Sequence, residues 1–522
     1  MDINELAEHA IQEQGEFKSL IFNGQSYTNI KLFDDARRLQ KSFSKLGMKK
    51  GSNIVLFLMN HPLIYPVFGG IFRTGATAIP VMFLLTAPEI RYILTDSRAE
   101  GIVTDVLNLE KIREAVQGLD HIKWILVLGG EDNAEISPAE YALEPFLDEK
   151  CEENLPKIDG GDVAIMMYTS GTTGKPKGVM LTHDNLYAQG QASANVSEFD
   201  KWEGPYISLS AMPMAHIFGV GVMVVGYMQP KRLVDEGAFG VQMAWFDTEQ
   251  FMSLVQQYRC TVMPAVPTML SLILNHPKVD EFDLTSLKEV VCGASPLPEE
   301  VVRSFETRFG CRVREIYGLT EATGLGSANR RSKPYKPGSA GLAHHNIQLK
   351  IFDGENNPLP PGERGEIVMQ GPSVMKGYFN LPEKTAEAMS GGWLHTGDIG
   401  YLDEDGYLFV VDRVKDMIIR GGENIYPAQL EEILYRFPGV AEAAIVGTPD
   451  QTYGENVVAF IVASPGAKLS EEEIIGFMKT ETSSFKVPSK IYLVDSLPKT
   501  PVGKILKREL REMAKVKGSK LE

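Results

Sequence analysis

One stretch of the sequence combines small residues, hydroxyl groups and positive charge in a way that points to phosphate chemistry. It occupies residues 168–179 and reads Tyr-Thr-Ser-Gly-Thr-Thr-Gly-Lys-Pro-Lys-Gly-Val. Its glycines let the backbone approach an anion closely, and its N–H and O–H groups can donate hydrogen bonds to phosphate oxygens. Lys175 and Lys177 add positive charge. The stretch therefore predicts a loop that binds a polyphosphate.

The segments on either side of this loop predict a buried strand before it and a helix after it. Residues 164–167 are apolar, and a helical pattern begins at His183. The loop is not a Walker A motif, because Gly174-Lys175 is followed by proline and no glycine stands five residues before Gly174. A flexible linker is the other interpretation, but linkers rarely combine this hydroxyl density with two lysines between regular elements.

Three further motifs follow segments that are expected to be strands. Residues 212–219, which include His216, follow the strand expected at 207–211, and Gly293-Ala294-Ser295 follows 290–292. Residues 317–324 follow 313–316. Ligands of α/β sheets gather at the carboxyl ends of strands, so these motifs are candidates for one site. Taken alone, a histidine among apolar residues is more often a satisfied core group.

The C-terminal third contains three more motifs with candidate chemistry. Asp398 ends the triplet Thr-Gly-Asp, and a carboxylate can accept hydrogen bonds from two neighbouring hydroxyls. Residues 412–427 contain two basic residues and a Gly-Gly pair, and Lys504 follows Val-Gly near the end of the chain. Each has an ordinary interpretation as a turn aspartate, a loop or a solvated lysine.

In this order, the motifs resemble the signature blocks of the adenylate-forming superfamily. Its members are acyl-CoA synthetases, aryl-CoA ligases, peptide-synthetase adenylation domains and firefly luciferase. The resemblance extends over essentially the whole chain and is to the medium- and long-chain fatty acyl-CoA synthetases. It implies ATP, Mg²⁺ and CoA as cofactors. It also implies two steps, in which a carboxylic acid forms acyl-AMP and pyrophosphate, and CoA then takes the acyl group and releases AMP.

By this resemblance, the nucleotide site draws residues from all these motifs: Thr169, Ser170, Gly171, Thr172, Thr173, Gly174, Lys177, Gly293, Ala294, Ser295, Tyr317, Gly318, Thr320, Asp398, Arg413 and Lys504. Tyr317 would stack on adenine, and Asp398 with Arg413 would surround the ribose. Thr169 and Glu321 would hold Mg²⁺, which prefers oxygen ligands and bridging phosphates. Some relatives have a lysine that contacts the nucleotide at the position where this chain has Ile419. That contact is therefore not assigned to this chain.

The resemblance also assigns the chemistry of the acid. Its catalytic residues are Lys504, Glu321, Thr169 and His216, and its acyl-pocket residues are His216, Phe218, Gly219 and Gly318. The carboxylate of the acid and the α-phosphate of ATP are both anions and must meet. Their negative charge would be stabilised by hydrogen-bond donors, Mg²⁺ and Lys504. Lys415 would be the hinge, and Gly421 with Gly422 would line the path of the CoA pantetheine arm.

The identity of the acid is suggested by residues 219–227, which are apolar and rich in small side chains. They favour a hydrophobic acid such as a medium- or long-chain fatty acid, although an aromatic or alicyclic acid would suit a similar lining. A helix in the protein core with no role in substrate binding would have the same composition. Two further alternatives remain open: a stand-alone adenylating enzyme that loads a carrier protein, and a non-catalytic nucleotide-binding relative.

Alternation of strand and helix patterns predicts the fold class, an α/β protein. We expect a large N-terminal domain, residues 1–415, with two parallel-type α/β sheet subdomains and a β subdomain after Gly338. Residues 416–522 are expected to form a small, mobile α+β lid that carries Lys504 and the face used in the CoA step.

Composition narrows the class of protein. The chain has 522 residues with 52 Lys and Arg against 68 Asp and Glu, and the net charge of −16 disfavours a general nucleic-acid binder. The scattered cysteines Cys151, Cys260, Cys292 and Cys311 predict neither disulfides nor structural zinc. With no signal peptide, no membrane span and no terminal peroxisomal signal expected, we predict a cytoplasmic protein, possible as a homodimer, whose partners are a small carboxylic acid and CoA.

Overall fold

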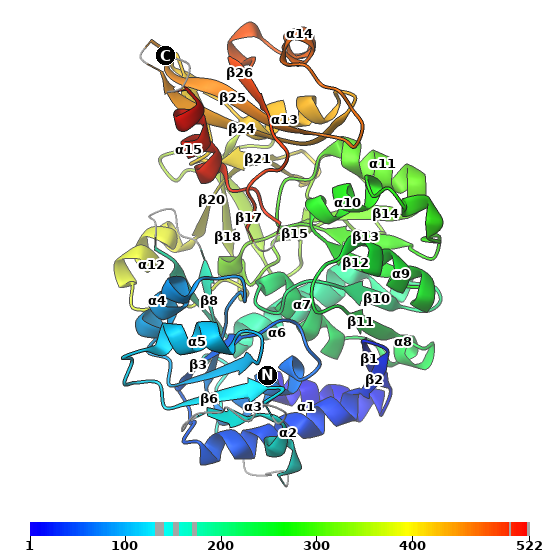
Figure 1. Ribbon diagram of the computed structural model, residues 1–522, viewed down its shortest axis with the longest axis vertical. Helices are drawn as coiled ribbons and strands as arrows, with labels where there is room; N and C mark the ends of the chain where they lie inside the picture. The colour runs from blue at the N-terminus through cyan, green and yellow to red at the C-terminus, as the bar shows by residue number, and fades with distance from the viewer. Residues whose placement is uncertain (131–139, 150–155, 170–174, 451, 501–502, 519–522) are drawn as a thin grey trace.

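The computed structural model describes residues 1–130, 140–149, 156–169, 175–450, 452–500 and 503–518. A large part, residues 1–415, contains two big sheets with helices around them and a smaller antiparallel sheet. A small part built from the remaining residues lies above it in Figure 1. This mixed α/β architecture confirms the predicted fold class.

The first big sheet is formed mainly by the first 182 residues. Its strand order is β19-β9-β8-β4-β3-β5-β6-β7, and the pairs from β8 through β4 and β3 to β7 are parallel. The strands are β3 (Asn53–Phe57), β4 (Thr77–Pro80), β5 (Gly101–Asp105), β6 (Trp124–Leu128), β7 (Glu140–Ala142), β8 (Val163–Thr169), β9 (Lys177–Thr182) and β19 (Gly377–Tyr378). The connecting and covering helices are α2 (Asn29–Lys45), α3 (Ile64–Thr74), α4 (Ala87–Ser97) and α5 (Leu109–Val116).

The second big sheet has the order β16-β15-β14-β13-β12-β10-β11-β1-β2 and is parallel from β14 to β1. Its strands are β1 (Lys18–Phe22), β2 (Gln25–Thr28), β10 (Ile207–Ser210), β11 (Phe239–Gln242), β12 (Val262–Ala265), β13 (Glu289–Cys292), β14 (Arg312–Tyr317), β15 (Ser327–Ala328) and β16 (Leu342–Ala343). Helices α8 (Lys231–Asp235), α9 (Thr248–Tyr258), α10 (Pro267–Leu274) and α11 (Glu299–Phe309) connect them.

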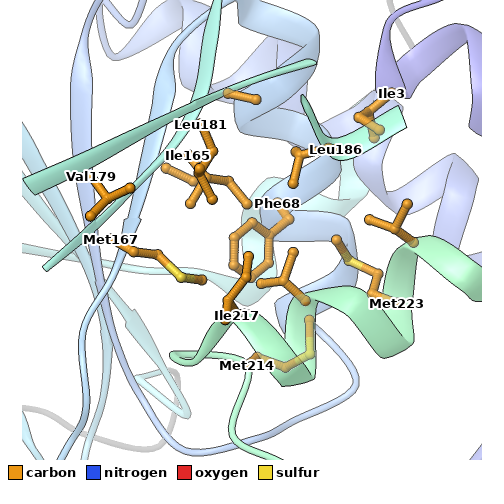
Figure 2. Packing of buried hydrophobic residues seen from close by; sticks show 14 of the residues in the cluster. Ile3, Phe68, Ile165, Met167, Val179, Leu181, Leu186, Met214, Ile217 and Met223 are labelled. Carbon is orange, nitrogen blue, oxygen red and sulfur yellow. The ribbon is translucent and has the colours of Figure 1, made fainter. Parts of the chain in front are cut away.

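A shared core joins these parts through α1 (Ile3–Gln14), α6 (His183–Ser197) and α7 (Ile217–Tyr227). Figure 2 shows Ile165, Val179 and Leu181 from the first sheet packed with Phe68 and with Met223 of α7. Burying a large apolar side chain stabilises a fold by about 1.5–3 kcal/mol, so this cluster fixes α7 against the first sheet. The N-terminus of α7 thereby acquires a defined position at the edge where the site forms.

The segment around the phosphate loop differs from the prediction in one respect. β8 and β9 form an antiparallel hairpin in which Thr169 lies opposite Lys177, so the loop joins two strands rather than a strand and a helix. The reason is the run from Val179 to Thr182, whose side chains are mostly buried in the sheet. The helix begins at His183 as predicted, because Thr182 caps it by accepting from the Asn185 backbone N–H.

The antiparallel sheet consists of β17 (Gln348–Phe352), β18 (Gly365–Gln370), β20 (Leu394–Leu402) and β21 (Leu408–Arg413), with α12 (Pro382–Ala388) beside it. A turn at residues 403–406, with the sequence Asp-Glu-Asp-Gly, joins β20 to β21. The small part contains β22 (Ile418–Arg420), β23 (Glu423–Ile425), α13 (Pro427–Tyr435), β24 (Val440–Asp450), β25 (Gly454–Ala463), α14 (Glu471–Glu481), β26 (Lys490–Leu493) and α15 (Lys507–Gly518). Figure 1 shows the segment before α15 extending from the small part down toward the large part.

Candidate functional site

Most of the predicted motifs meet at the carboxyl edge of the second big sheet. The strands β10, β13 and β14 run parallel within it, so the residues that follow them share one edge. His216 lies after β10, Gly293 follows β13, and Tyr317 ends β14. The long β20–β21 hairpin adds Asp398 and Arg413, which lie opposite each other in the ladder.

The best-defined feature of this edge is a hydrogen-bonded group around Asp398. Tyr317 donates its hydroxyl to Asp398 Oδ2 at 2.7 Å, and Arg413 Nε lies 3.0 Å from Asp398 Oδ1. Burial and the adjacent carboxylate raise the pKa of Tyr317 well above its usual value, so the tyrosine remains a donor. Burial opposes the charge of Arg413, but Asp398 together with Tyr317, Asp416 and Glu321 outweighs burial and raises the pKa of Arg413. Each carboxylate oxygen keeps a second lone pair, so Asp398 can still accept from a ribose hydroxyl.

Lys504 reaches this group from the small part. Its backbone is held in a turn, where its carbonyl accepts from Thr500 N–H at 2.7 Å and its own N–H donates to Thr500 Oγ1 at 3.1 Å. Burial, followed by the nearby charges of Arg413 and Lys415, lowers the pKa of Lys504 to about 8, although Asp398 opposes the shift. Lys504 is therefore half-buried beside Asp398 and Arg413 as a cation at neutral pH.

The turn before Lys504 touches the large part directly. Gly503 has φ +78°, and a Cβ there would lie 2.5 Å from Thr268 Oγ1 at the start of α10. Only glycine therefore fits both the backbone conformation and the space. This close approach fixes the depth to which the lysine enters the site.

His216 stands at the start of α7. Its Nδ1 accepts from the Phe218 N–H at 3.2 Å and so caps the helix. Burial, and then the charge of Lys504, lowers the pKa of His216 to about 4, so the ring is neutral at pH 7. With Nδ1 acting as an acceptor, the neutral ring carries its proton on Nε2. The arrangement makes His216 a neutral donor rather than a second cation.

Glycines allow backbone segments of the site to lie unusually close together. A Cβ on Gly293 would come within 2.7 Å of the Ile316 carbonyl oxygen, and one on Gly318 would overlap the carbonyl of Gly324. Gly219 packs against the carbonyl of Pro213 in the same way. Ala294, between Gly293 and Ser295, has φ +73°. These segments would leave the flat space at the strand ends that a planar ring needs.

Glu321 lies in a short 3₁₀ turn, Thr320–Ala322, directly after β14. Its Oε1 accepts from the Tyr378 hydroxyl at 3.0 Å, and Lys177 Nζ lies 4.6 Å from the centre of the Tyr378 ring. Tyr378 thus links the predicted metal ligand to the β8–β9 hairpin, and no local motif in the sequence indicated this role. Of the predicted loop contacts, Thr169 and Lys177 end and begin the paired strands, while Ser170, Gly171, Thr172, Thr173 and Gly174 lie outside the described residues.

The donor set is compatible with Mg²⁺ held jointly with phosphate. In the described ranges no group of three or more His, Cys, Asp or Glu could hold a metal ion alone. Glu321 and the Thr169 hydroxyl are hard oxygen ligands, and Mg²⁺ usually combines one or two such groups with substrate phosphates. The residues present therefore fit a metal that arrives with a nucleotide.

Two predicted features lie apart from this group. Gly421 and Gly422, with φ +61° and +87°, form the exposed turn between β22 and β23, where Gly421 N–H donates to the Tyr453 carbonyl. Lys415 lies between β21 and β22, and burial with the charge of Arg413 lowers its pKa. The structure thus brings Lys504 into the site and leaves the Gly-Gly turn at the surface of the small part.

A cavity of about 280 Å³ lies beside α7 in the large part; of the predicted acyl-pocket residues, Phe218 lines it, whereas His216, Gly219 and Gly318 do not. It runs along α7 past Phe218, Gly221 and Gly226, with Ser208 and Gly240 of the second sheet on its other side. Small residues on both facing surfaces leave this space, where parallel strands usually carry bulky β-branched residues. Tyr65 and Gln242 form part of its lining, and their side chains are hydrogen-bonded at 3.2 Å. The sequence had indicated only the α7 wall.

Among the residues that the structure describes, no helix has both the length and the apolar character needed to cross a bilayer.

The chain is similar to known proteins over most of its length. Residues 7–379 match the family model of the AMP-binding enzyme, and residues 429–504 match that of the AMP-binding enzyme C-terminal domain. Over 519 residues the chain is 34% identical to a long-chain-fatty-acid–CoA ligase of Bacillus subtilis (strain 168), covering 95% of this chain and 91% of the relative. It is 36% identical over 490 residues to a feruloyl-CoA synthase of Amycolatopsis sp, covering 94% of both. Among solved structures, ATP-bound MatB from Rhodopseudomonas palustris is similar with a TM-score of 0.87 at 27% identity, covering 99% of both chains.

Proposed function

This chain belongs to the AMP-binding enzyme family and is an AMP-forming acid–CoA ligase, and from this premise we propose that its acid is a medium- or long-chain fatty acid. The observation that carries the proposal is the cavity beside α7. Its volume of about 280 Å³ is nearly twice the roughly 150 Å³ that accommodates benzene in a protein interior. An extended acyl chain uses such a space more fully than a single ring does.

The position of the cavity fits an acid with its carboxylate at the strand ends. Phe218 lines it near His216, and Tyr227 lines it at the other end of α7. A helix rises about 1.5 Å per residue, so the first and last residues of α7 are about 15 Å apart. The acyl chain would lie along this helix, with His216, Phe218, Gly219 and Gly318 around the carboxylate end.

The chemistry of the first step follows from charge. A carboxylate must attack the α-phosphorus of ATP, and two anions repel each other as they meet. Lys504 is a half-buried cation, and His216 presents a neutral N–H; neither residue needs to transfer a proton. Preorganised donors in a site shielded from water stabilise developing charge strongly. We assign Lys504 to the carboxylate and α-phosphate oxygens, where it lowers the barrier to acyl-AMP formation.

The remaining residues would hold the nucleotide. Asp398 would accept from the ribose hydroxyls while Tyr317 and Arg413 hold its carboxylate in place. The other contacts proposed for ATP are Thr169, Ser170, Gly171, Thr172, Thr173, Gly174, Lys177, Gly293, Ala294, Ser295, Gly318 and Thr320. Mg²⁺ on Thr169 and Glu321 would neutralise phosphate charge.

The CoA step requires a second arrangement of the chain. We propose that residues 416–522 act as a lid that turns about Lys415 relative to residues 1–415. Lys504 would leave the site, and the exposed turn of Gly421 and Gly422 would come to the CoA arm. Hinges of this kind absorb their motion in a few residues.

Location and assembly are inferred less directly. Cys260, Cys292 and Cys311 are free and buried, and burial raises the pKa of Cys260 and Cys311 to about 12. Such thiols suit a reducing compartment, and we propose a cytoplasmic enzyme. A homodimer is compatible with this assignment and is tested by mass measurement in solution.

An aromatic acid is the second candidate, because the relative from Amycolatopsis is a feruloyl-CoA synthase. The test is CoA-dependent AMP formation with Mg-ATP across acetate, octanoate, palmitate, benzoate, cyclohexane carboxylate and ferulate. We expect the highest kcat/KM with octanoate or palmitate. A preference for ferulate or benzoate would overturn the fatty-acid assignment. Pyrophosphate release without CoA consumption would instead indicate a carrier-protein acceptor.

A further inference from the structure

Two helices that meet at the boundary between the large and small parts begin without caps of their own. α11 begins after Pro298 and α13 begins after Tyr426, and within the described residues neither of these two positions has a side chain that accepts from its helix. The first N–H groups of a helix need acceptors, and the helix dipole favours a negative charge beside them. Both helices obtain a carboxylate from across the boundary.

The two caps are reciprocal. Glu432 of α13, in the small part, accepts from the Glu299 N–H of α11 at 3.1 Å through Oε1 and at 3.3 Å through Oε2. Asp412 of β21, in the large part, accepts from the Ala428 N–H of α13 at 2.9 Å. Each part therefore completes a helix of the other, and these contacts exist only while the two parts hold their present arrangement.

The capped helix is connected to the catalytic lysine. Leu430 and Leu434 of α13 are buried in the core of the small part, so the helix moves with that sheet. Three residues after Lys504, Lys507 Nζ forms an ion pair with Glu431 of α13 at 2.7 Å. The position of α13 against α11 therefore sets the position of Lys504 in the site.

The surroundings of Glu432 make its cap weak enough to break. Burial raises the pKa of Glu432, and the carboxylates of Glu299 and Glu300 add to that shift. Burial, and then the charge of Glu432, raises the pKa of half-buried Glu315 in β14 to about 8, so Glu315 carries little negative charge at pH 7. Arg436 and the capped N–H oppose these effects. Attraction to the helix terminus thus works against burial and against repulsion from the carboxylates of Glu299 and Glu300, as suits a contact that must be released in every cycle.

We propose that Glu432 is a positioning residue for acyl-AMP formation: its cap on α11 holds the small part where Lys504 reaches the acid and the nucleotide. The proposal rests on the proposed function, because it requires that the two parts separate for the CoA step. Asp412 supports the same arrangement from the opposite side. Neither carboxylate touches the reacting atoms.

The test separates the two half-reactions of the full-length enzyme. Acid-dependent ATP–pyrophosphate exchange reports adenylation, and transfer from supplied acyl-AMP to CoA reports the second step. For Glu432→Ala we expect exchange to fall about fivefold, the effect of a lost helix cap, while transfer is unchanged or faster. Glu432→Gln keeps an oxygen acceptor and should retain most of the exchange.

A matched control comes from a cap inside the large part. Asp247 caps α9 by accepting from the Gln250 N–H at 2.8 Å, so Asp247→Ala removes a cap without touching the boundary. Both Ala variants should lower the melting temperature slightly, but only Glu432→Ala should change the ratio of the two half-reactions. Equal loss of both half-reactions in Glu432→Ala, or an unchanged ratio, would overturn the proposal. Absence of exchange in the unaltered enzyme with every acid would instead contradict the proposed function.

Discussion

Lys504 and His216 come from opposite ends of the fold, yet the charge of the lysine acts on the imidazole. Burial and that charge together hold the pKa of His216 at about 4. The histidine is therefore neutral in the presence of the lysine, and these two residues together carry one positive charge rather than two. Five expectations follow from this and from the neighbouring contacts.

Removing the lysine should affect one step far more than the other. For Lys504→Ala we expect adenylation to fall by roughly 10²–10³, the about 3–4 kcal/mol lost with one donor to developing charge. Transfer from supplied acyl-AMP to CoA should remain near its normal rate. The measurement is the same pair of half-reactions, and an equal loss in both would show that Lys504 acts on more than the first barrier.

The pH dependence of adenylation should reflect the same residue. The pKa of Lys504 is lowered to about 8, so the lysine is charged below pH 8 and loses its charge above it. We expect kcat/KM for exchange to fall by roughly tenfold per pH unit above about 8, as for a single essential ionisation of the free enzyme. Lys504→Arg keeps its charge at these pH values and should lack this decline. If kcat/KM of the arginine variant declines with the same midpoint pH, the decline arises from the ionisation of another group.

The glycine before the lysine offers a test of how Lys504 is placed. In Gly503→Ala the new Cβ meets Thr268 and the positive φ is strained, so exchange should fall by at least tenfold. Gly466→Ala is the matched control, because Gly466 has φ +80° and nothing within 4 Å of its Cβ position. Thr268→Ala added to Gly503→Ala should restore part of the exchange. If Thr268→Ala restores no exchange and both glycine variants lose exchange equally, backbone strain rather than the contact with Thr268 explains the loss.

The cavity should be shortened by filling it at Gly226. A Cβ there has nothing within 4 Å, so Gly226→Leu can enter the space without disturbing the backbone. We expect kcat/KM for palmitate to fall at least tenfold while that for a short acid changes little. Gly476→Leu, at another open helical glycine that lies in exposed α14, is the control. Equal effects on all chain lengths would argue that the acyl chain lies elsewhere.

The hydroxyl of Tyr317 should contribute to nucleotide binding through Asp398. Tyr317→Phe keeps the ring and removes the 2.7 Å hydrogen bond to the carboxylate. Hydrogen bonds to charged groups contribute about 1.5–3 kcal/mol, so we expect the KM for ATP to rise by roughly tenfold or more. The KM for the acid should change little. A rise in the KM for the acid alone would indicate that Tyr317 contacts the acid rather than the nucleotide.

Much of the fold could be predicted because local signals agreed with the tertiary structure. The apolar spacing of residues 248–258 is helical and Asp247 caps this segment, and the structure has α9 at these residues. β5 and β13 likewise match short apolar runs followed by turns. The β8–β9 hairpin was missed, because Gly178 and Pro176 made the second strand look like part of the loop.

The site was predicted to the extent that its residues belong to contiguous motifs. Tyr378 was not expected, because its contact with Glu321 is created only when β19 pairs with β9. Tyr65 and Gln242 enter the cavity lining from segments with no distinctive pattern. Glu432 and Asp412 also lack a signal, since a cap supplied by another helix cannot be read from spacing along one segment. Long-range pairing is what local sequence does not encode.

Helix α7 has two ends with different duties. In the proposed function, His216 at its start would act on the carboxylate, whereas Gly226 near its end, which lines the cavity, would limit the length of the acid. Substitutions at the far end therefore change the range of acids without altering the groups that activate them. Evolution of this protein could thus change its acid specificity through a few glycine and serine positions while its catalytic residues stay the same.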